Sequence, residues 1–194
     1  MVSIKQKAAL ASILVTVALT AAKGAVGLAS GSIAILAEAA HGLVDTAATL
    51  LTFYAVRLAD KPADDDHQYG HGKVESIAAL AETAFLFLVS GIVVTEAVRR
   101  LSGGGHAVEV TPLMAGLMVA VIAIDFWRVR VMRRIAGETG SQALESGALH
   151  FASDMASSAV VLAGLFFVWL GYPKADAIAA IVVAILICVM SWQL

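Results

Sequence analysis

Long apolar segments follow one another along almost the whole chain, and they constrain its fold more than any other feature. A helix needs about 20 residues to cross the hydrocarbon core of a bilayer. The candidate helices run over residues 8–29, 32–58, 72–98, 111–134, 142–170 and 174–193. With 60% hydrophobic and 14% charged residues in a total of 194, no room is left for a sizeable water-soluble domain. We therefore expect an all-α membrane protein, a six-transmembrane-helix bundle that forms a single domain over residues 1–194.

The basic residues predict the orientation of this bundle, because cytoplasmic connections of membrane proteins carry an excess of Lys and Arg. Nine basic residues are predicted on the side that holds both termini, and three on the other. The first set is Lys5, Lys7, Arg57, Lys61, Lys73, Arg128, Arg130, Arg133 and Arg134, and the second is Arg99, Arg100 and Lys174. Both termini are therefore expected in the cytoplasm, as in a multi-pass protein of the cell (plasma or inner) membrane.

Two histidine–aspartate pairs lie inside the apolar segments, His41 with Asp45 and His150 with Asp154. Residues four apart lie on one face of a helix. Inserting a carboxylate at the centre of a bilayer costs roughly 2.5–3.5 kcal/mol on insertion scales, so two such pairs are not expected without a function. The segments 32–58 and 142–170 are expected to be antiparallel. Where they cross, the four side chains would surround one divalent metal ion.

Two imidazoles and two carboxylates suit tetrahedral Zn²⁺, and the same set accepts Co²⁺, Cd²⁺ or Fe²⁺. Calcium and magnesium fit poorly, because both prefer six or more oxygen ligands. Histidine must be neutral to bind a metal, and its reference pKa is about 6.5, so that metal binding releases protons. These properties predict a proton-coupled antiporter that exports Zn²⁺ from the cytoplasm by alternating access to a midplane site. Its partners would be divalent metal ions, protons and the lipid bilayer.

The sequence fits three other functions less well than it fits transport. Helix packing explains a single buried histidine or aspartate, but two packing contacts need not share the same spacing and polarity. A membrane-embedded zinc metalloenzyme would use the same ligands. However, the chain has no His-Glu-x-x-His motif, and four protein ligands leave no open position for water. A nucleic-acid partner is disfavoured by the net charge of −2.

The connection between the second and third segments carries a second group of candidate ligands. His67 and His71 are four residues apart, and Asp64 precedes His67 by three. One turn of helix or a compact loop would present all three to a peripheral Zn²⁺. The alternative is a solvated charged connector without a metal.

The chain resembles the cation diffusion facilitators, zinc-transporting efflux proteins with six transmembrane helices. The resemblance is carried by residues 37–45, by residues 149–154 and by the loop sequence His-Gln-Tyr-Gly-His-Gly-Lys-Val-Glu-Ser at 67–76. It implies that the transport site consists of His41, Asp45, His150 and Asp154. Family members with histidine at the first of these four positions, as here, prefer zinc, whereas members with aspartate there accept a broader range of metals. It also implies a peripheral zinc site on the loop.

The same resemblance implies a homodimer. Members of the family usually continue past the sixth helix into a cytosolic metal-binding domain of ferredoxin-like form, which helps to hold the dimer. Because this sequence stops at Leu194, in or just after the sixth predicted helix, that domain is expected to be absent from it and the dimer to be weakened. Lys73 matches a position that joins a salt-bridge network between protomers in the family.

Several further charged residues lie in apolar segments. Asp125 is expected to pair with Arg128 three residues later, near the membrane edge, and a role in proton relay is the alternative. Supporting roles at most are expected for Glu38, one helical turn before His41, and for Glu82, Glu96 and Asp176.

Overall fold

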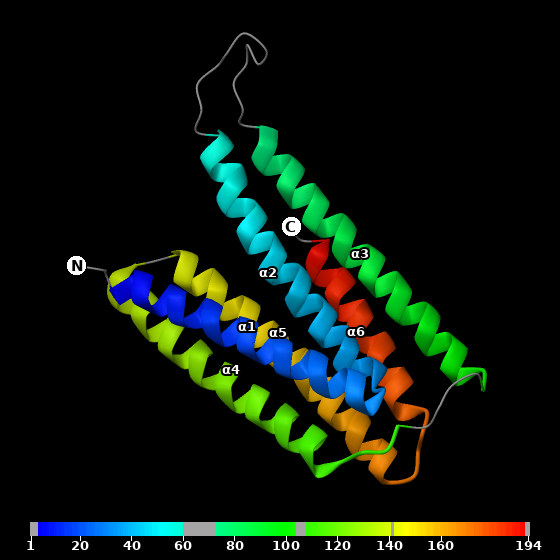
Figure 1. The fold of residues 1–194 in the computed structure, drawn as a ribbon. Helices are drawn as coiled ribbons and strands as arrows, with labels where there is room; N and C mark the ends of the chain where they lie inside the picture. Colours follow the sequence, from blue (N-terminus) through cyan, green and yellow to red (C-terminus); the bar gives the residue numbers. More distant parts are fainter. Residues whose placement is uncertain (1–3, 60–72, 104–107, 141, 193–194) are drawn as a thin grey trace.

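The computed structural model describes residues 4–59, 73–103, 108–140 and 142–192, and its secondary structure is entirely helical (Figure 1). The helices are α1 (Ile4–Ser30), α2 (Ile33–Ala59), α3 (Lys73–Leu101), α4 (Pro112–Thr139), α5 (Gln142–Trp169) and α6 (Ala175–Ser191). No strand occurs in these ranges. Each predicted segment corresponds to one helix, and the predicted all-α class is confirmed.

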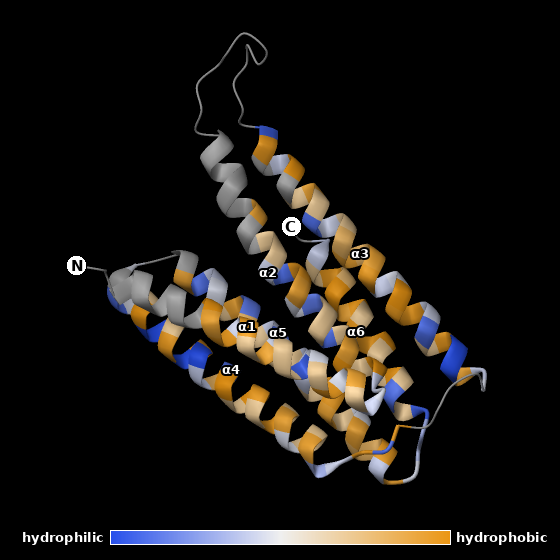
Figure 2. Cartoon of the chain, viewed as in Figure 1, coloured by the Kyte–Doolittle hydropathy of each residue, from blue (hydrophilic) through white to orange (hydrophobic). Residues whose placement is uncertain are grey.

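The surface of the bundle is suited to lipid. In the described ranges, four helices contain stretches long and apolar enough to cross a membrane, and α6 is apolar but has 17 residues. The four stretches are Ile13–Ser30, Ala79–Leu101, Pro112–Glu138 and Leu144–Trp169. Large apolar side chains such as Leu14, Leu28 and Leu113 are exposed on the outside, and apolar residues predominate along the coloured helices (Figure 2). Such a surface fits a bilayer better than water.

The helices form two arms that meet at one end and diverge at the other (Figure 1). One arm consists of α1, α4 and α5, and the other of α2, α3 and α6. We call the end with the α1–α2 and α5–α6 turns the joined end. The opposite end, at which α1 begins and α2 ends, is called the open end. Antiparallel α2 and α5 belong to different arms, so a site between them lies where the arms face each other.

Polar contacts fix the start of α2 at the joined end. The hydroxyl of Ser32 donates to Asp176 at the start of α6, and the backbone N–H of Ile33 donates to the other carboxylate oxygen at 2.8 Å. Arg100 of α3 donates to the carbonyl of Gly31 at 2.6 Å, where a positive φ of 68° turns the chain. Asp176 therefore caps α2 and satisfies N–H groups that a helix start leaves without partners. Its buried charge has a structural explanation.

The apolar core has two parts. The larger cluster joins α2, α3, α5 and α6 with the first turns of α4, through side chains such as Ile35, Leu86 and Met118. The smaller cluster lies between α4 and α5 and includes Ala136 near the end of α4. Because Ala136 packs in this cluster, α4 continues to Thr139, five residues beyond the predicted end at 134.

Helices α5 and α6 approach each other closely at Gly164. A Cβ atom added there would lie 2.5 Å from the Cβ of Ala179 and 3.3 Å from the carbonyl oxygen of Ala175. Real Cβ atoms do not lie 2.5 Å apart, and the methyl group of Ala179 cannot rotate away, so the two helices would have to separate. Small residues at such contacts allow the close packing on which helix association in membranes depends.

We expect Gly164→Ala to destabilise the protein by about 1–3 kcal/mol, because the added methyl group overpacks the contact between α5 and α6. Gly116→Ala is the matched control, since a Cβ atom at Gly116 meets nothing within 4 Å. Thermal unfolding in detergent should show a lower midpoint for Gly164→Ala alone. Equal midpoints for the two variants would contradict the close packing of α5 on α6.

Candidate metal centre

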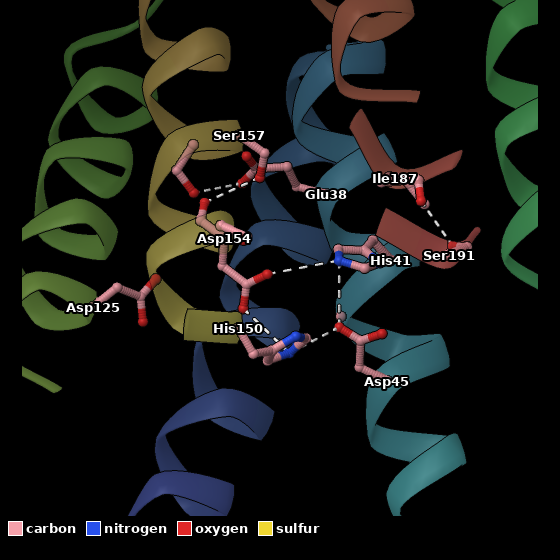
Figure 3. A network of polar contacts seen from close by, with 12 residues as sticks. Glu38, His41, Asp45, Asp125, His150, Asp154, Ser157, Ile187 and Ser191 are labelled. Carbon is pink, nitrogen blue, oxygen red and sulfur yellow. Dashed lines mark hydrogen bonds and ion pairs between the residues drawn. The ribbon is translucent and has the colours of Figure 1, made fainter. Parts of the chain in front are cut away.

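Four side chains from α2 and α5 converge in the interior of the bundle (Figure 3). The Nε2 atom of His41 lies 3.4 Å from Oδ2 of Asp45 and 3.6 Å from Oδ1 of Asp154. The Nε2 atom of His150 lies 3.5 Å from Oδ2 of Asp45 and 3.7 Å from Oδ2 of Asp154. Each histidine therefore faces both carboxylates, and we call these four side chains the ligand ring.

The geometry of the ligand ring follows from the sequence spacing. The spacing of four places each histidine and its aspartate on one helix face. Because α2 and α5 are antiparallel, His41 lies opposite Asp154, and Asp45 lies opposite His150. The ligand atoms of His41, Asp45 and Asp154 are all within 4.8 Å of one another.

The distances in the ligand ring fit a small tetrahedral ion. Zinc bonds to nitrogen and oxygen of about 2.0–2.1 Å separate tetrahedral ligands by about 3.3 Å. Each histidine lies 3.4–3.7 Å from an oxygen of both aspartates, which is close to this value and too long for a strong hydrogen bond. The two distances to Asp154 end on different oxygens, and among the described residues the mutually close group consists of His41, Asp45 and Asp154. In addition, Oδ1 of Asp154 is buried without a hydrogen-bond partner among the described residues. A metal ion would satisfy that oxygen, which is otherwise costly to bury.

The ligand ring is not equally buried on all sides. The side chains of His41, Asp45 and Asp154 are 10%, 14% and 19% exposed, whereas that of His150 is 41% exposed. His150 precedes Asp154 on α5 and therefore lies nearer the open end. An ion that approaches from the open end would meet His150 first.

A buried ion pair lies one helical turn from the ligand ring toward the joined end. The Nζ atom of Lys23 on α1 is 2.8 Å from Oε2 of Glu38 on α2, and the hydroxyl of Ser158 on α5 donates to the same oxygen at 2.8 Å. The sequence spacing did not predict this pair, because Lys23 and Glu38 lie on different helices. A lysine inside an apolar segment was the available signal, because a buried ammonium group requires an acidic partner.

A second buried pair lies on α4. The predicted bond between Asp125 and Arg128 is confirmed, with Nη1 to Oδ1 at 2.8 Å. Arg128 also donates to the hydroxyl of Thr16 at 2.7 Å, and its guanidinium carbon lies 3.5 Å from the centre of the Phe151 ring. Because Arg128 is buried among α1, α4 and α5, it does not belong with the basic residues at the membrane edge. The set of nine basic residues predicted on one side therefore loses Arg128.

Comparison with known families agrees with these observations. Residues 9–194 match the sequence model of a protein family described as the cation efflux transmembrane domain. The chain belongs to the cation efflux family. The cation-efflux pumps FieF of Citrobacter koseri and Klebsiella pneumoniae are each 37% identical over 163 residues, which is 81% of this chain and 52% of each relative. The FieF pump of Shigella boydii is 36% identical over the same length. The chain thus spans about half the length of the curated relatives it matches.

Membership of the cation efflux family and the apolar helices together make this chain a multi-pass protein of the cell (plasma or inner) membrane. The relatives are named as pumps, in keeping with the expectation of a transporter and not an enzyme. The predicted peripheral ligands Asp64, His67 and His71 lie outside the described residues. Glu96 pairs with Arg99 and Arg100 near the joined end of α3, and its charge is accounted for there.

A small cavity of about 30 Å³ connects these groups in the cation efflux domain. Its walls come from α1, α2, α4 and α5 and include Lys23, Glu38, His41, Asp125 and Asp154. The volume corresponds to about one water molecule or one small ion. The ligand ring and the two ion pairs therefore share one polar interior.

We expect His41→Ala to weaken Co²⁺ binding about tenfold more than His150→Ala, because water replaces an exposed ligand more easily than a buried one. Titration with Co²⁺, followed by the visible absorption of the tetrahedral ion, measures both affinities. Losses of equal size, or a larger loss for His150→Ala, would contradict the difference in burial as the cause.

Proposed function

We propose that the protein exports divalent metal ions, with Zn²⁺ as the principal substrate, in exchange for protons, and that His41, Asp45, His150 and Asp154 bind the ion. Membership of the cation efflux family supports metal transport. The observation that carries the site assignment is that each of the two histidines lies 3.4–3.7 Å from an oxygen of both aspartates, where α2 and α5 face each other. No comparable observation favours a membrane-embedded zinc metalloenzyme.

Charge supports a divalent substrate. The two aspartates of the ligand ring carry two negative charges, which one divalent ion neutralises. The neighbouring carboxylates Glu38 and Asp125 are already paired with Lys23 and Arg128. A neutral assembly is favoured inside a bilayer, where a net charge is costly.

The chemistry of the ligands supports zinc and proton exchange. Two nitrogen and two oxygen ligands suit Zn²⁺, with Co²⁺, Cd²⁺ and Fe²⁺ as further candidates. A histidine that binds metal must give up its proton, and an empty site takes protons up again. Protons from outside would therefore displace the metal and occupy the ligand ring during the return.

We propose that all six helices cross the membrane, with both termini and the open end in the cytoplasm. At 1.5 Å per residue, the 27 residues of α2 extend about 40 Å, long enough to span. Three basic residues lie at the open end, as expected for a cytoplasmic side: Lys73 at the start of α3, and Arg133 and Arg134 near the end of α4. The divergence of the two arms toward this end supports an inward-facing state, from which alternating access would move the site outward (Figure 1).

Two further proposals rest on the resemblance to the cation diffusion facilitators. Asp64, His67 and His71 would form a peripheral zinc site in the cytoplasm, near the open end. Two copies of the chain would assemble as a homodimer.

We expect Zn²⁺ to enter proteoliposomes with an acidic lumen while the lumen becomes more alkaline, because each ion entering the lumen is exchanged for protons leaving it. Asp154→Asn should lower the uptake at least about tenfold, since it removes one of two charged ligands. Glu138→Gln is the control, because Glu138 is an exposed residue on α4. Uptake that persists in Asp154→Asn would overturn the site. Uptake without a change of lumenal pH would overturn proton coupling.

We expect His41→Asp to raise the transport of Cd²⁺ relative to Zn²⁺, because a third carboxylate is a less directional ligand than imidazole and discriminates less between these ions. Competition of Cd²⁺ with Zn²⁺ uptake in the same proteoliposomes measures the ratio. An unchanged ratio would show that His41 does not control selectivity.

A further inference from the structure

The ion pair between Lys23 and Glu38 is among the most deeply buried polar contacts in the described part of the chain. Lys23 is 8% exposed, Glu38 is 3% exposed and Ser158 is fully buried. The ammonium group lies 2.8 Å from Oε2 of Glu38 and 3.4 Å from the Ser158 hydroxyl, so that the contact ties α1, α2 and α5 together. An apolar trio of similar size would fill this space without the cost of burying two charges.

The position of the pair connects it with the ligand ring. Glu38 precedes His41 by three residues on α2, and Ser158 follows Asp154 by four on α5, so both lie one turn nearer the joined end. Lys23 and Glu38 line the same small cavity as His41 and Asp154. Figure 3 shows Glu38 beside Ser157, next to the ligand ring.

Glu38 has the character of a latent metal ligand. Its Oε2 atom is held by Lys23 and Ser158, but its Oε1 atom is buried without a hydrogen-bond partner among the described residues. A free carboxylate at this place would add a third negative charge and a fifth ligand to the two histidines and two aspartates. Sites richer in oxygen favour harder ions such as Mn²⁺ over Zn²⁺.

We propose that Lys23 determines the metal selectivity of the ligand ring by neutralising Glu38 and keeping it out of the coordination sphere. The inference rests on the proposed transport site and adds a residue on α1, which supplies no ligand. With Lys23 in place, the ligand ring presents two negative charges and four ligands. Without it, Glu38 becomes available to the ion, which is then held more tightly and with a different preference.

The two single substitutions have opposite expected effects. Lys23→Met leaves Glu38 without its cation and should strengthen divalent metal binding, more for Mn²⁺ than for Zn²⁺, and slow turnover. Glu38→Gln leaves the ammonium group without its carboxylate, and its positive charge should weaken the binding of both ions. Each change should be at least about tenfold, because one unit charge acts on a divalent ion in a medium of low dielectric constant. A purely structural contact would change affinity in the same direction in both variants.

The double variant Lys23→Met with Glu38→Gln separates charge from packing. It lacks the ion pair but restores the net charge, and its affinities for Zn²⁺ and Mn²⁺ should return to within about threefold of the wild type. Arg134→Met with Glu138→Gln is the matched control, because it neutralises an exposed ion pair on α4 with a nitrogen–oxygen distance of 3.0 Å. The control should leave both affinities unchanged.

The experiment measures equilibrium binding of Zn²⁺ and Mn²⁺ to the purified protein in detergent, with uptake of both ions in proteoliposomes. Single variants that shift affinity in the same direction, or a double variant that loses Zn²⁺ binding, would overturn the proposal. If one single variant does not fold, the other still decides, because Lys23→Met must strengthen metal binding and Glu38→Gln must weaken it. Retention of Zn²⁺ binding by Asp154→Asn would instead overturn the transport site itself, so the two failures are distinguishable.

Discussion

Two aspartates and two histidines face one another between α2 and α5, and the buried ion pairs of the bundle lie around them. Charge inside an apolar bundle is tolerated only where it is paired or functional. Glu38 and Asp125 are each matched by a cation from the same region, Lys23 and Arg128. Around the ligand ring these carboxylates are neutralised in pairs, and the buried Asp176 is held instead by hydrogen bonds at the start of α2. The two aspartates of the ligand ring face histidines instead, which gives a metal ion a chemical reason to bind there.

The joined end determines how α2 and α5 face each other. Asp176 of α6 and Arg100 of α3 hold the start of α2, and Gly164 lets α5 lie directly against α6. These contacts all lie on one side of the ligand ring, and the arms diverge on the other (Figure 1). Any exchange of access must therefore rearrange contacts near the joined end, and the buried pair of Lys23 and Glu38 lies one helical turn from the ligand ring on that side.

The sequence predicted the number and class of the helices well, because a long apolar run has few alternatives to a helix. It also predicted which residues of α2 and α5 share a face, since the helical repeat alone determines this. The end of α4 was predicted too early, because the packing of Ala136 against α5 is a tertiary contact. The peripheral set in the connection after α2 stays a prediction.

The pairing of Lys23 with Glu38 was missed for a similar reason. The two residues lie on different helices, and no local spacing connects them. Arg128 was assigned to the membrane edge by its distance from the end of the segment, whereas Asp125, Thr16 and Phe151 hold it inside. Periodicity predicts which face a residue occupies, but the partner on another helix depends on how the helices pack.

The two negative charges of the ligand ring have an electrical consequence. Bound to one divalent ion, or carrying two protons, the four side chains have no net charge. When access to the site changes from one side of the bilayer to the other, no net charge then crosses the membrane potential, whereas one elementary charge would involve about 2.3 kcal/mol per 100 mV. The rate of such a transporter would depend on the differences in proton and metal concentration across the membrane and not on the membrane potential.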